Sequence, residues 1–319
     1  MAICFKLTML RLSGAMALLA VALSATSRAG DLSELRDKVW IHGAEDCETN
    51  RDPPLQVFRF DADTYVLRQN KCVNYEAPFI YVLFGQHTVF VQDTGATEDA
   101  AQFPIYETIR KLMHGRGSPQ LKMLVTHSHS HGDHRAGDAQ FRGKPGVTLV
   151  EPNNEAVRNY FGFTHWPEGT ATVDLGGRSL TVLPAPGHQT ESLAVFDPHT
   201  GWLLTGDSVY PGRLYVWDWP TFKASVRRMA EFARTQPVTA VMGTHIELSR
   251  TGEQFPAGST FQPNEASLVL TPEDLAQLDR LLQKAGDEPK EIATTSYVVS
   301  PIGTVQRVIS TIMKALTPD

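Results

Sequence analysis

The sequence predicts an α/β (α+β) fold: a four-layer αββα sandwich of two mixed β-sheets packed face to face, with helices outside. Two observations support this prediction. Short apolar segments of strand length alternate along the chain with segments of helical periodicity. Hairpin-like pairs of strands also occur both early and late in the chain. The composition is that of a globular protein, with 42% apolar and 20% charged residues among 319.

The first half of the chain begins with an irregular segment. Residues 31–75 are polar, and Asp52-Pro53-Pro54 interrupts any regular element, so we expect irregular structure there. Regular elements follow, and the turn Gly85-Gln86-His87 separates the first two buried strands. We expect strands at 79–84, 88–91, 121–125 and 147–150, and helices at 103–113 and 154–161.

The second half contains two further hairpins and three helices. Gly176-Gly177-Arg178 and the segment 197–201 have turn chemistry between strand-like neighbours. We expect strands at 172–175, 179–183, 192–196, 202–205, 239–242 and 297–300, and helices at 222–234, 272–285 and 305–316. With no internal repeat or linker, residues 30–319 are predicted to form one domain. Its core covers about residues 75–250, and a C-terminal extension of helices and a strand covers 251–319.

The N-terminus has the pattern of a secretory signal peptide over residues 1–29. Lys6 and Arg11 precede the apolar run 15–23, and Ser27-Arg28-Ala29 offers small residues for cleavage. The run is shorter than the ~20 apolar residues that span a bilayer, although an uncleaved anchor stays the alternative. We therefore expect a periplasmic or secreted protein with no stable membrane anchor after cleavage.

Charge narrows the class of partner. Cleavage removes three basic residues and moves the formal charge from −6 to −9. An acidic chain without a basic run is a poor candidate for nucleic acid or anionic lipid, so we expect a small-molecule substrate. The oligomeric state is not predicted.

Two cysteines remain after cleavage, Cys47 and Cys72. An isolated pair in an oxidising compartment often forms a disulfide, and we expect one here. Neither cysteine lies in a metal-binding spacing. Two free buried thiols are the alternative.

Four of the eleven histidines lie between positions 127 and 134. The strand at 121–125 delivers this segment at its end, where alternate residues share a face, so His129 and His131 can point together. A turn at Gly132 can bring Asp133 and His134 round from the other side. Imidazole and carboxylate suit zinc, and also iron or manganese. A surface histidine run is the alternative, but such clusters usually bind metal.

The run His129-Ser130-His131-Gly132-Asp133-His134 resembles the His-x-His-x-Asp-His signature of the metallo-β-lactamase superfamily. Four further segments are similar to motifs of that family, in the expected order over about residues 75–250: Asp93-Thr94-Gly95, Pro186-Gly187-His188 followed by Ser192, Thr205-Gly206-Asp207, and Gly243-Thr244-His245. Each motif is weak alone, but five in the right order are a strong match.

The resemblance implies a ligand set for two divalent metal ions, most simply zinc, with iron or manganese open. The first metal would be held by His129, His131 and His188. The second would be held by Asp133, His134 and His245, with Asp207 bridging the two. Asp93 would orient ligands rather than bind metal. A register starting at His127 would put Gly132 at a ligand position, so His127 is either a neighbour of the site or an inert strand-end residue.

The resemblance also implies a hydrolase in which a metal-bridging hydroxide attacks an ester-, thioester-, lactone- or amide-like bond. Asp133 would be catalytic, orienting the water or carrying a proton. Asp207 is typical of thioesterases like glyoxalase II, of lactonases and of phosphodiesterase- or sulfatase-like branches, whereas β-lactamases usually have cysteine or serine there.

Three alternatives stay open. One is a β-lactamase, which the predicted secretory signal peptide favours. The others are a mono-iron persulfide dioxygenase-like oxidoreductase and a non-catalytic metal-binding module. Tyr210, Arg213 and Tyr215 follow Asp207 and are either substrate contacts or residues that end a strand.

Overall fold

The computed structural model describes Met1 and residues 30–303. A first sheet has the order β1-β2-β3-β4-β5-β6, antiparallel from β1 to β4 and parallel from β4 to β6. Its strands are β1 (Leu55–Arg59), β2 (Thr64–Gln69), β3 (Phe79–Phe84), β4 (Thr88–Gln92), β5 (Lys122–Thr126) and β6 (Val147–Leu149).

A second sheet has the order β13-β12-β10-β9-β8-β7, with β10 and β12 parallel and the other neighbours antiparallel. Its strands are β7 (Ala171–Asp174), β8 (Ser179–Pro184), β9 (Leu193–Asp197), β10 (Trp202–Gly206), β12 (Ala240–Gly243) and β13 (Val269–Leu270). A small third sheet joins β11 (Arg213–Val216), β15 (Val298–Pro301) and β14 (Ile292–Ala293).

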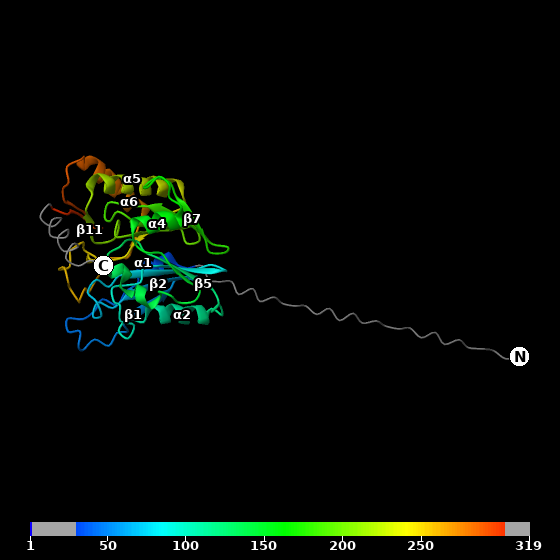
Figure 1. Ribbon diagram of the computed structural model, residues 1–319. Helices are drawn as coiled ribbons and strands as arrows, with labels where there is room; N and C mark the ends of the chain where they lie inside the picture. Colours follow the sequence, from blue (N-terminus) through cyan, green and yellow to red (C-terminus); the bar gives the residue numbers. More distant parts are fainter. Residues whose placement is uncertain (2–29, 304–319) are drawn as a thin grey trace.

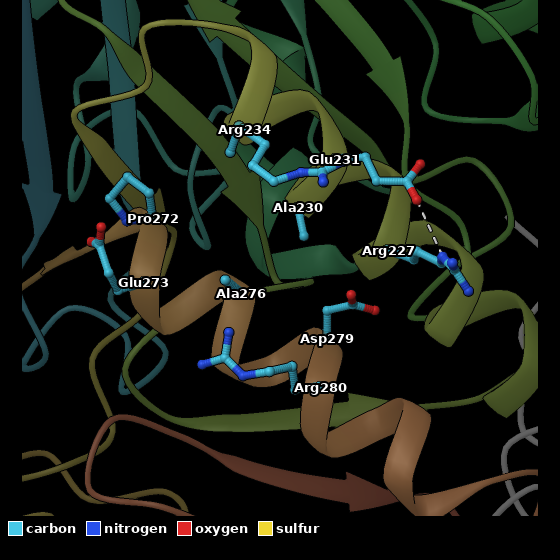
Figure 2. A pocket seen from close by; sticks show the side chains of 10 residues that line it. Arg227, Ala230, Glu231, Arg234, Pro272, Glu273, Ala276, Asp279 and Arg280 are labelled. Atoms are coloured by element: carbon cyan, nitrogen blue, oxygen red, sulfur yellow. Dashed lines mark hydrogen bonds and ion pairs between the residues drawn. The ribbon is translucent and has the colours of Figure 1, made fainter.

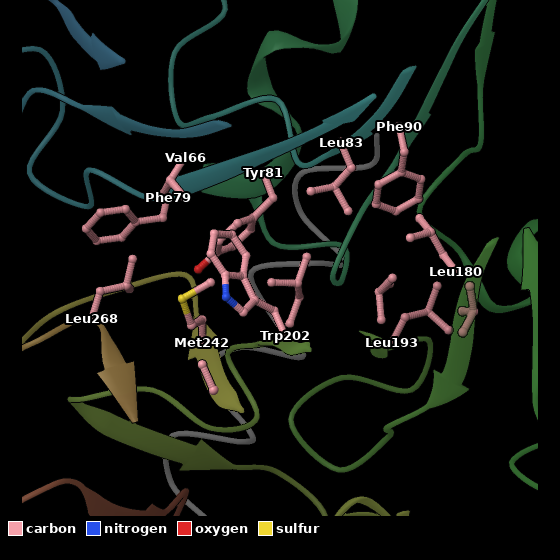
Figure 3. Close-up of a cluster of buried hydrophobic side chains, with 14 of the residues drawn as sticks. Val66, Phe79, Tyr81, Leu83, Phe90, Leu180, Leu193, Trp202, Met242 and Leu268 are labelled. Atoms are coloured by element: carbon pink, nitrogen blue, oxygen red, sulfur yellow. The ribbon is translucent and has the colours of Figure 1, made fainter. Parts of the chain in front are cut away.

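The two large sheets pack face to face through apolar side chains. Phe79, Tyr81 and Phe90 of the first sheet belong to the same buried cluster as Trp202 and Met242 of the second (Figure 3). Strands β3, β9 and β10 are buried along their whole length. This is why they read as near-continuous apolar runs rather than as alternating patterns, because each is covered on both faces.

Helices cover the outer face of each sheet, which completes four layers (Figure 1). Helix α2 (Ile105–Gly115) packs its buried residues against the first sheet. Helices α5 (Trp219–Thr235) and α6 (Pro272–Ala285) cover the second sheet. The predicted αββα sandwich is confirmed. The shorter helices are α1 (Leu32–Arg36), α3 (Gly132–Arg135), the 3₁₀ turn η1 (Ala136–Gln140) and α4 (Asn154–Phe161).

The prediction of irregular structure over residues 31–75 is wrong for a large part of that segment, which contains α1, β1 and β2. All six residues of β2 are buried, including the polar Thr64, Arg68 and Gln69. Arg68 can be buried because it forms a bidentate ion pair with Glu265, with Nη2 2.6 Å from Oε1. That partner is 197 positions away, so no local periodicity could reveal it.

Most other boundaries differ from the predicted ones by one or two residues. Helix α5 begins three residues earlier than expected, at Trp219, because the Asp218 carboxylate accepts the Thr221 N–H and caps it. Strands β13 and β14 were not predicted, and neither was β11. It pairs in parallel with β15, whose partner positions lie 85 residues away. The predicted helix at 305–316 lies outside the described residues.

Cys47 and Cys72 form a disulfide, as predicted. The signal-peptide segment lies almost wholly outside the described residues, and the division into domains stays a prediction. Within residues 30–303, no helix combines the length and apolar character needed to cross a membrane.

Candidate metal centre

The predicted metal ligands come from the carboxyl ends of strands in both sheets. His129 and His131 follow β5, and Asp133 and His134 lie on α3, the short helix after them. Three more candidates come from the second sheet: His188 between β8 and β9, Asp207 after β10, and His245 after β12. Parallel strands end at the same edge of a sheet, which brings side chains far apart in the chain to one place.

The first cluster contains His129, His131, His188 and Asp207. Nε2 of His129 lies 2.9 Å from Nδ1 of His131 and 3.2 Å from Nε2 of His188. Nε2 of His188 lies 3.1 Å from Nδ1 of His131. The ligand atoms of three imidazoles therefore face one point, with His131 using the opposite ring nitrogen from the other two.

The second cluster contains Asp133, His134 and His245. Oδ2 of Asp133 lies 3.0 Å from Nε2 of His134 and 3.1 Å from Nε2 of His245. The two imidazole Nε2 atoms are 3.3 Å apart. This is a second convergent point, with one carboxylate and two imidazoles.

The Asp207 carboxylate faces both clusters. Its Oδ2 lies 3.7 Å from Nε2 of His129 in the first cluster and 3.6 Å from Nε2 of His134 in the second. Its Oδ1 lies 3.5 Å from Nε2 of His245. One carboxylate thus stands between the two groups.

The outer ring nitrogens show that these clusters fit metal ions. Nδ1 of His188 lies 2.8 Å from the Tyr215 carbonyl oxygen, and Nδ1 of His245 lies 3.1 Å from that of Glu76. A carbonyl only accepts, so each Nδ1 carries a proton, and in the neutral ring the Nε2 atom presents a lone pair to the cluster. Nδ1 of His134 donates in the same way to Oδ2 of Asp93, 3.0 Å away.

When both rings are neutral, lone pairs of buried Nε2 atoms face each other at about hydrogen-bond distance within the second cluster. Two facing lone pairs repel unless a cation lies between them. A proton would satisfy one pair of nitrogens, whereas a divalent metal ion satisfies both imidazoles and the carboxylate at once. The donor sets of both clusters fit a dinuclear metal site.

The electrostatics favour the ligating forms in the first cluster. Burial, followed by the neighbouring imidazole of His134, holds the pKa of His129 well below its usual value. Burial, followed by His188, lowers the pKa of His131 to about 3. Burial opposes ionisation of Asp207, but the His245 and His134 imidazoles outweigh it and hold the pKa of that carboxyl well below its usual value. Neutral His129 and His131 thus lie beside an ionised Asp207, whereas in the second cluster the Asp207 and Asp133 carboxylates outweigh burial and raise the pKa of His245 to about 9.

A sequence model of the metallo-β-lactamase superfamily matches residues 74–245, slightly more than half of the chain and a range that includes every candidate ligand. The chain belongs to the metallo-β-lactamase superfamily. It carries an intact set of the histidines and aspartates suited to bind metal in this fold.

Curated relatives match over part of their length. The hydroxyacylglutathione hydrolase of Dechloromonas aromatica is 32% identical over 141 residues, which are 43% of this chain and 47% of the relative. That of Rhizobium meliloti is 26% identical over 139 residues, 43% of this chain and 52% of the relative. The chain spans about half the length of the curated relatives it matches.

Solved structures of the superfamily share the fold. The metallo-β-lactamase FIM-1 from Pseudomonas aeruginosa superposes with a TM-score of 0.51 at 15% identity, covering 75% of this chain and 99% of that one. The TMB-1 structure gives a TM-score of 0.50 at 17% identity, covering 73% and 99%. At these identities the likeness concerns the fold alone.

Asp93 supports the centre through hydrogen bonds to Ser128 and His134. Its Oδ1 accepts the Ser128 N–H at 2.6 Å, and its Oδ2 accepts the Ser128 hydroxyl at 2.9 Å beside His134. Asp93 has φ +72°, a backbone conformation that aspartate and asparagine adopt more readily than most residues. The carboxylate thereby sets the orientation of the His134 ring.

Residues that sequence reasoning missed act through the main chain. The carbonyls of Glu76 and Tyr215 hold the outer nitrogens of His245 and His188. Any residue type supplies a carbonyl, so no side-chain motif could identify these positions. The segment that carries Glu76 is held by the Lys71 ammonium, which donates to the Tyr75 carbonyl at 2.8 Å, and by the adjacent disulfide.

His127 belongs to neither cluster. Its Nε2 lies 2.8 Å from Oδ1 of Asp138, which also accepts the Thr94 hydroxyl at 2.8 Å, and its Nδ1 lies 3.2 Å from the Val150 carbonyl. It is a buried neighbour of the site that links the end of β5 to η1.

The candidate substrate contacts after Asp207 differ in their burial and in what they contact. Tyr210 is buried, and its hydroxyl donates to the Arg213 carbonyl while its ring packs on His245. It supports the centre and is closed to substrate. Tyr215 is half-buried and contributes the carbonyl that holds His188.

Two pockets differ in their relation to the centre. One of about 320 Å³ is lined by His131 and His188 of the first cluster. A larger one of about 430 Å³ lies between α5 and α6, in the outer helical layer (Figure 2). It carries exposed charges of both signs, such as the Arg227–Glu231 pair 3.2 Å apart, and no candidate metal ligand. Of the two, the smaller pocket is the one that adjoins candidate metal ligands.

Proposed function

We propose that this protein is a dinuclear metal hydrolase that cleaves an ester-, thioester- or lactone-like bond of a small molecule. The observation that carries the proposal is the position of Asp207, one carboxylate that lies between two histidine clusters and within 3.7 Å of an imidazole nitrogen in each. Such an arrangement is suited to hold two metal ions side by side. Zinc is the expected metal, because imidazole and carboxylate are its usual ligands in catalytic sites.

Two bound divalent ions would supply Lewis acidity and would lower the pKa of water toward about 7. The chain's own residues determine the charge between the metal positions and the handling of water and protons. Asp207 is held ionised by its histidine neighbours and contributes negative charge between the two positions. The Asp133 side chain is 18% exposed, compared with 0% for His134. Asp133 therefore lies at the mouth of the centre, where its carboxylate can orient a water molecule and carry a proton toward the leaving group.

The bond type is inferred from the ligand set and the relatives. An aspartate at position 207 favours the thioesterase and lactonase branches over the β-lactamases. The matched hydroxyacylglutathione hydrolases bear the name of a thioester-cleaving activity, which supports a carbonyl substrate. We further propose a periplasmic or secreted location, supported by the N-terminal pattern and by the Cys47–Cys72 disulfide. The acidic chain supports a small molecule, and not nucleic acid, as the partner.

Metal analysis and a substrate panel test this proposal together. We expect close to two zinc ions per purified chain, and hydrolysis of at least one thioester, lactone or aryl ester in a panel that also contains phosphodiesters, aryl sulfates and β-lactams. Turnover of the last three classes alone would contradict the proposed bond type. Asp207→Ala and His131→Ala are expected to lose that activity. His199→Ala, a histidine outside both clusters, serves as the matched control.

Several results would overturn the proposal. One iron per chain with oxygen consumption on a persulfide would assign a dioxygenase instead. Full metal content without turnover of any panel member would indicate a metal-binding module. Unchanged activity in both cluster variants would place the reaction elsewhere.

A further inference from the structure

The pocket beside the first cluster is lined mostly by residues that are not candidate metal ligands. Its walls are His131, the segment 186–190, and the residues Trp217, Asp218 and Thr221 at the start of α5. Its volume of about 320 Å³ lies at the lower end of the roughly 300–1,000 Å³ typical of small-molecule sites. The pocket therefore suits one substituent of a small substrate.

The two walls are fixed to each other by main-chain bonds. The N–H groups of Trp217 and Asp218 both donate to the Gly187 carbonyl at 3.0 Å. Gly187 has φ +130°, and a Cβ there would lie 2.4 Å from the Phe222 Cα, so no side chain fits between the walls. The pocket is thus formed before a ligand arrives, which lowers the entropic cost of binding.

The walls are mostly apolar. Trp217 and Pro186 line the pocket together with Thr190 and Thr221. Among the described residues that line the pocket, none is lysine or arginine. A substituent bound there gains from leaving water but meets no lysine or arginine side chain.

Apart from the metal-ligand histidines, the ionisable side chain that lines this pocket is Asp218. Asp218 is exposed and caps α5, accepting the Thr221 N–H at 3.1 Å. The N-terminus of a helix attracts anions, but here the chain's own carboxylate already occupies it, and Pro220 has no N–H to offer. A carboxylate on the substrate would therefore meet Asp218 instead of a free helix terminus.

We propose that this pocket binds an uncharged alkyl or aryl group of the substrate while the scissile carbonyl lies at the metal centre. The preferred substrates are then neutral esters, thioesters or lactones with an apolar substituent. Glutathione thioesters, whose peptide carries carboxylates, are poor substrates. This inference rests on the proposed function, whose substrate class it narrows.

Kinetics on a graded series test it. In S-methyl thioesters of acetic, butyric and hexanoic acid, the leaving thiol is too small to fill the pocket, so only the acyl chain can. A reciprocal series of acetyl thioesters of longer alkanethiols covers binding through the leaving group. We expect kcat/KM to rise about fourfold per added methylene in one of the two series. The chain-matched monothioester of adipic acid, which ends in a carboxylate, is expected to react at least about tenfold more slowly than the hexanoyl thioester.

Two variants separate the apolar and the charged contributions. Trp217→Ala is expected to reduce the gradient to less than about twofold per methylene. Asp218→Asn retains a capping side chain and is expected to raise the ratio of kcat/KM for the carboxylate thioester to kcat/KM for the neutral one about threefold. Tyr160→Ala, which removes an exposed aromatic side chain on α4, is the matched control and should behave as wild type.

A binding measurement makes the outcome independent of turnover. The ketone 2-octanone cannot be hydrolysed, and ligand-observed NMR should show it binding to the metal-loaded protein about fivefold or more tightly than to Trp217→Ala. If no ester, thioester or lactone is hydrolysed, the proposed function fails, and 2-octanone binding still decides the pocket. If thioesters are hydrolysed without a gradient, or with one that Trp217→Ala leaves intact, the pocket assignment is overturned and the proposed function stands.

Discussion

Replacing Asp93 by asparagine should selectively weaken the second metal position. Oδ1 of Asp93 accepts the Ser128 main-chain N–H at 2.6 Å, so the asparagine oxygen must take that place. Its NH₂ group then replaces Oδ2, which lies 2.9 Å from the Ser128 hydroxyl and 3.0 Å from Nδ1 of His134. The hydroxyl can turn and accept, but the Nδ1–H of His134 cannot.

His134 escapes this donor–donor contact by moving its proton to Nε2. That nitrogen is the one that faces Asp133 and His245, so the second cluster loses a lone pair. Loss of such an outer hydrogen bond typically costs about 10–100-fold in metal affinity, or roughly 1.4–2.7 kcal/mol. The backbone should tolerate the change, because asparagine adopts the φ of +72° found at Asp93.

Competition with a zinc chelator, followed by metal counting, measures the effect. We expect one of the two zinc ions to leave Asp93→Asn at about 10–100-fold lower chelator strength than in wild type, while the other is retained. Asp174→Asn is the matched control, because Asp174 caps the turn between β7 and β8 at the Gly176 N–H, 2.8 Å away. Two zinc ions with wild-type affinity in Asp93→Asn would refute the reasoning about the His134 tautomer.

Three further predictions concern stability, each measured by urea unfolding. Burial lowers the pKa of Lys71 to about 8, below its unfolded value of 10.5, so the unfolded state binds more protons between these pH values. The unfolding free energy should therefore rise over that window by up to about 3 kcal/mol, and Lys71→Met should abolish the rise; an equal rise in the variant contradicts it. Cys72→Ser removes the disulfide to Cys47, which is 25 residues away, and should lower the unfolding free energy by roughly 3 kcal/mol. Reduction should lower it equally in the wild type and should leave the variant unchanged. Arg178→Met leaves Asp197 buried without its partner at 3.0 Å and should cost about 3–5 kcal/mol, much of it recovered in the double variant with Asp197→Leu; a loss below about 1 kcal/mol would contradict the buried pair.

Much of the fold could be predicted because its strands and helices carry their own signals. Strand β3 is a continuous apolar run, and α6 begins at a Thr271–Asp274 capping box followed by Pro272. Strands β1, β2, β11, β13 and β14 were not predicted, and β2 and β11 illustrate the reason. Arg68 in β2 is buried against Glu265, and β11 is a strand because β15 lies beside it. Their partners are distant in the chain, so the local sequence contains no trace of the pairing.

The same division holds at the metal centre. The sequence by itself determined the chemical identities of the ligands, because closely spaced histidines and aspartates with turn glycines are a local pattern, strongest at His129–His134. Only the tertiary structure decided which nitrogen each histidine presents, because the Tyr215 and Glu76 carbonyls that hold the outer nitrogens arrive from other elements. It also decided that Asp207 stands between the clusters and that Trp217 lines a pocket beside them. A motif specifies which ligand atoms are present, but their directions and distances are set when the two sheets pack around one core.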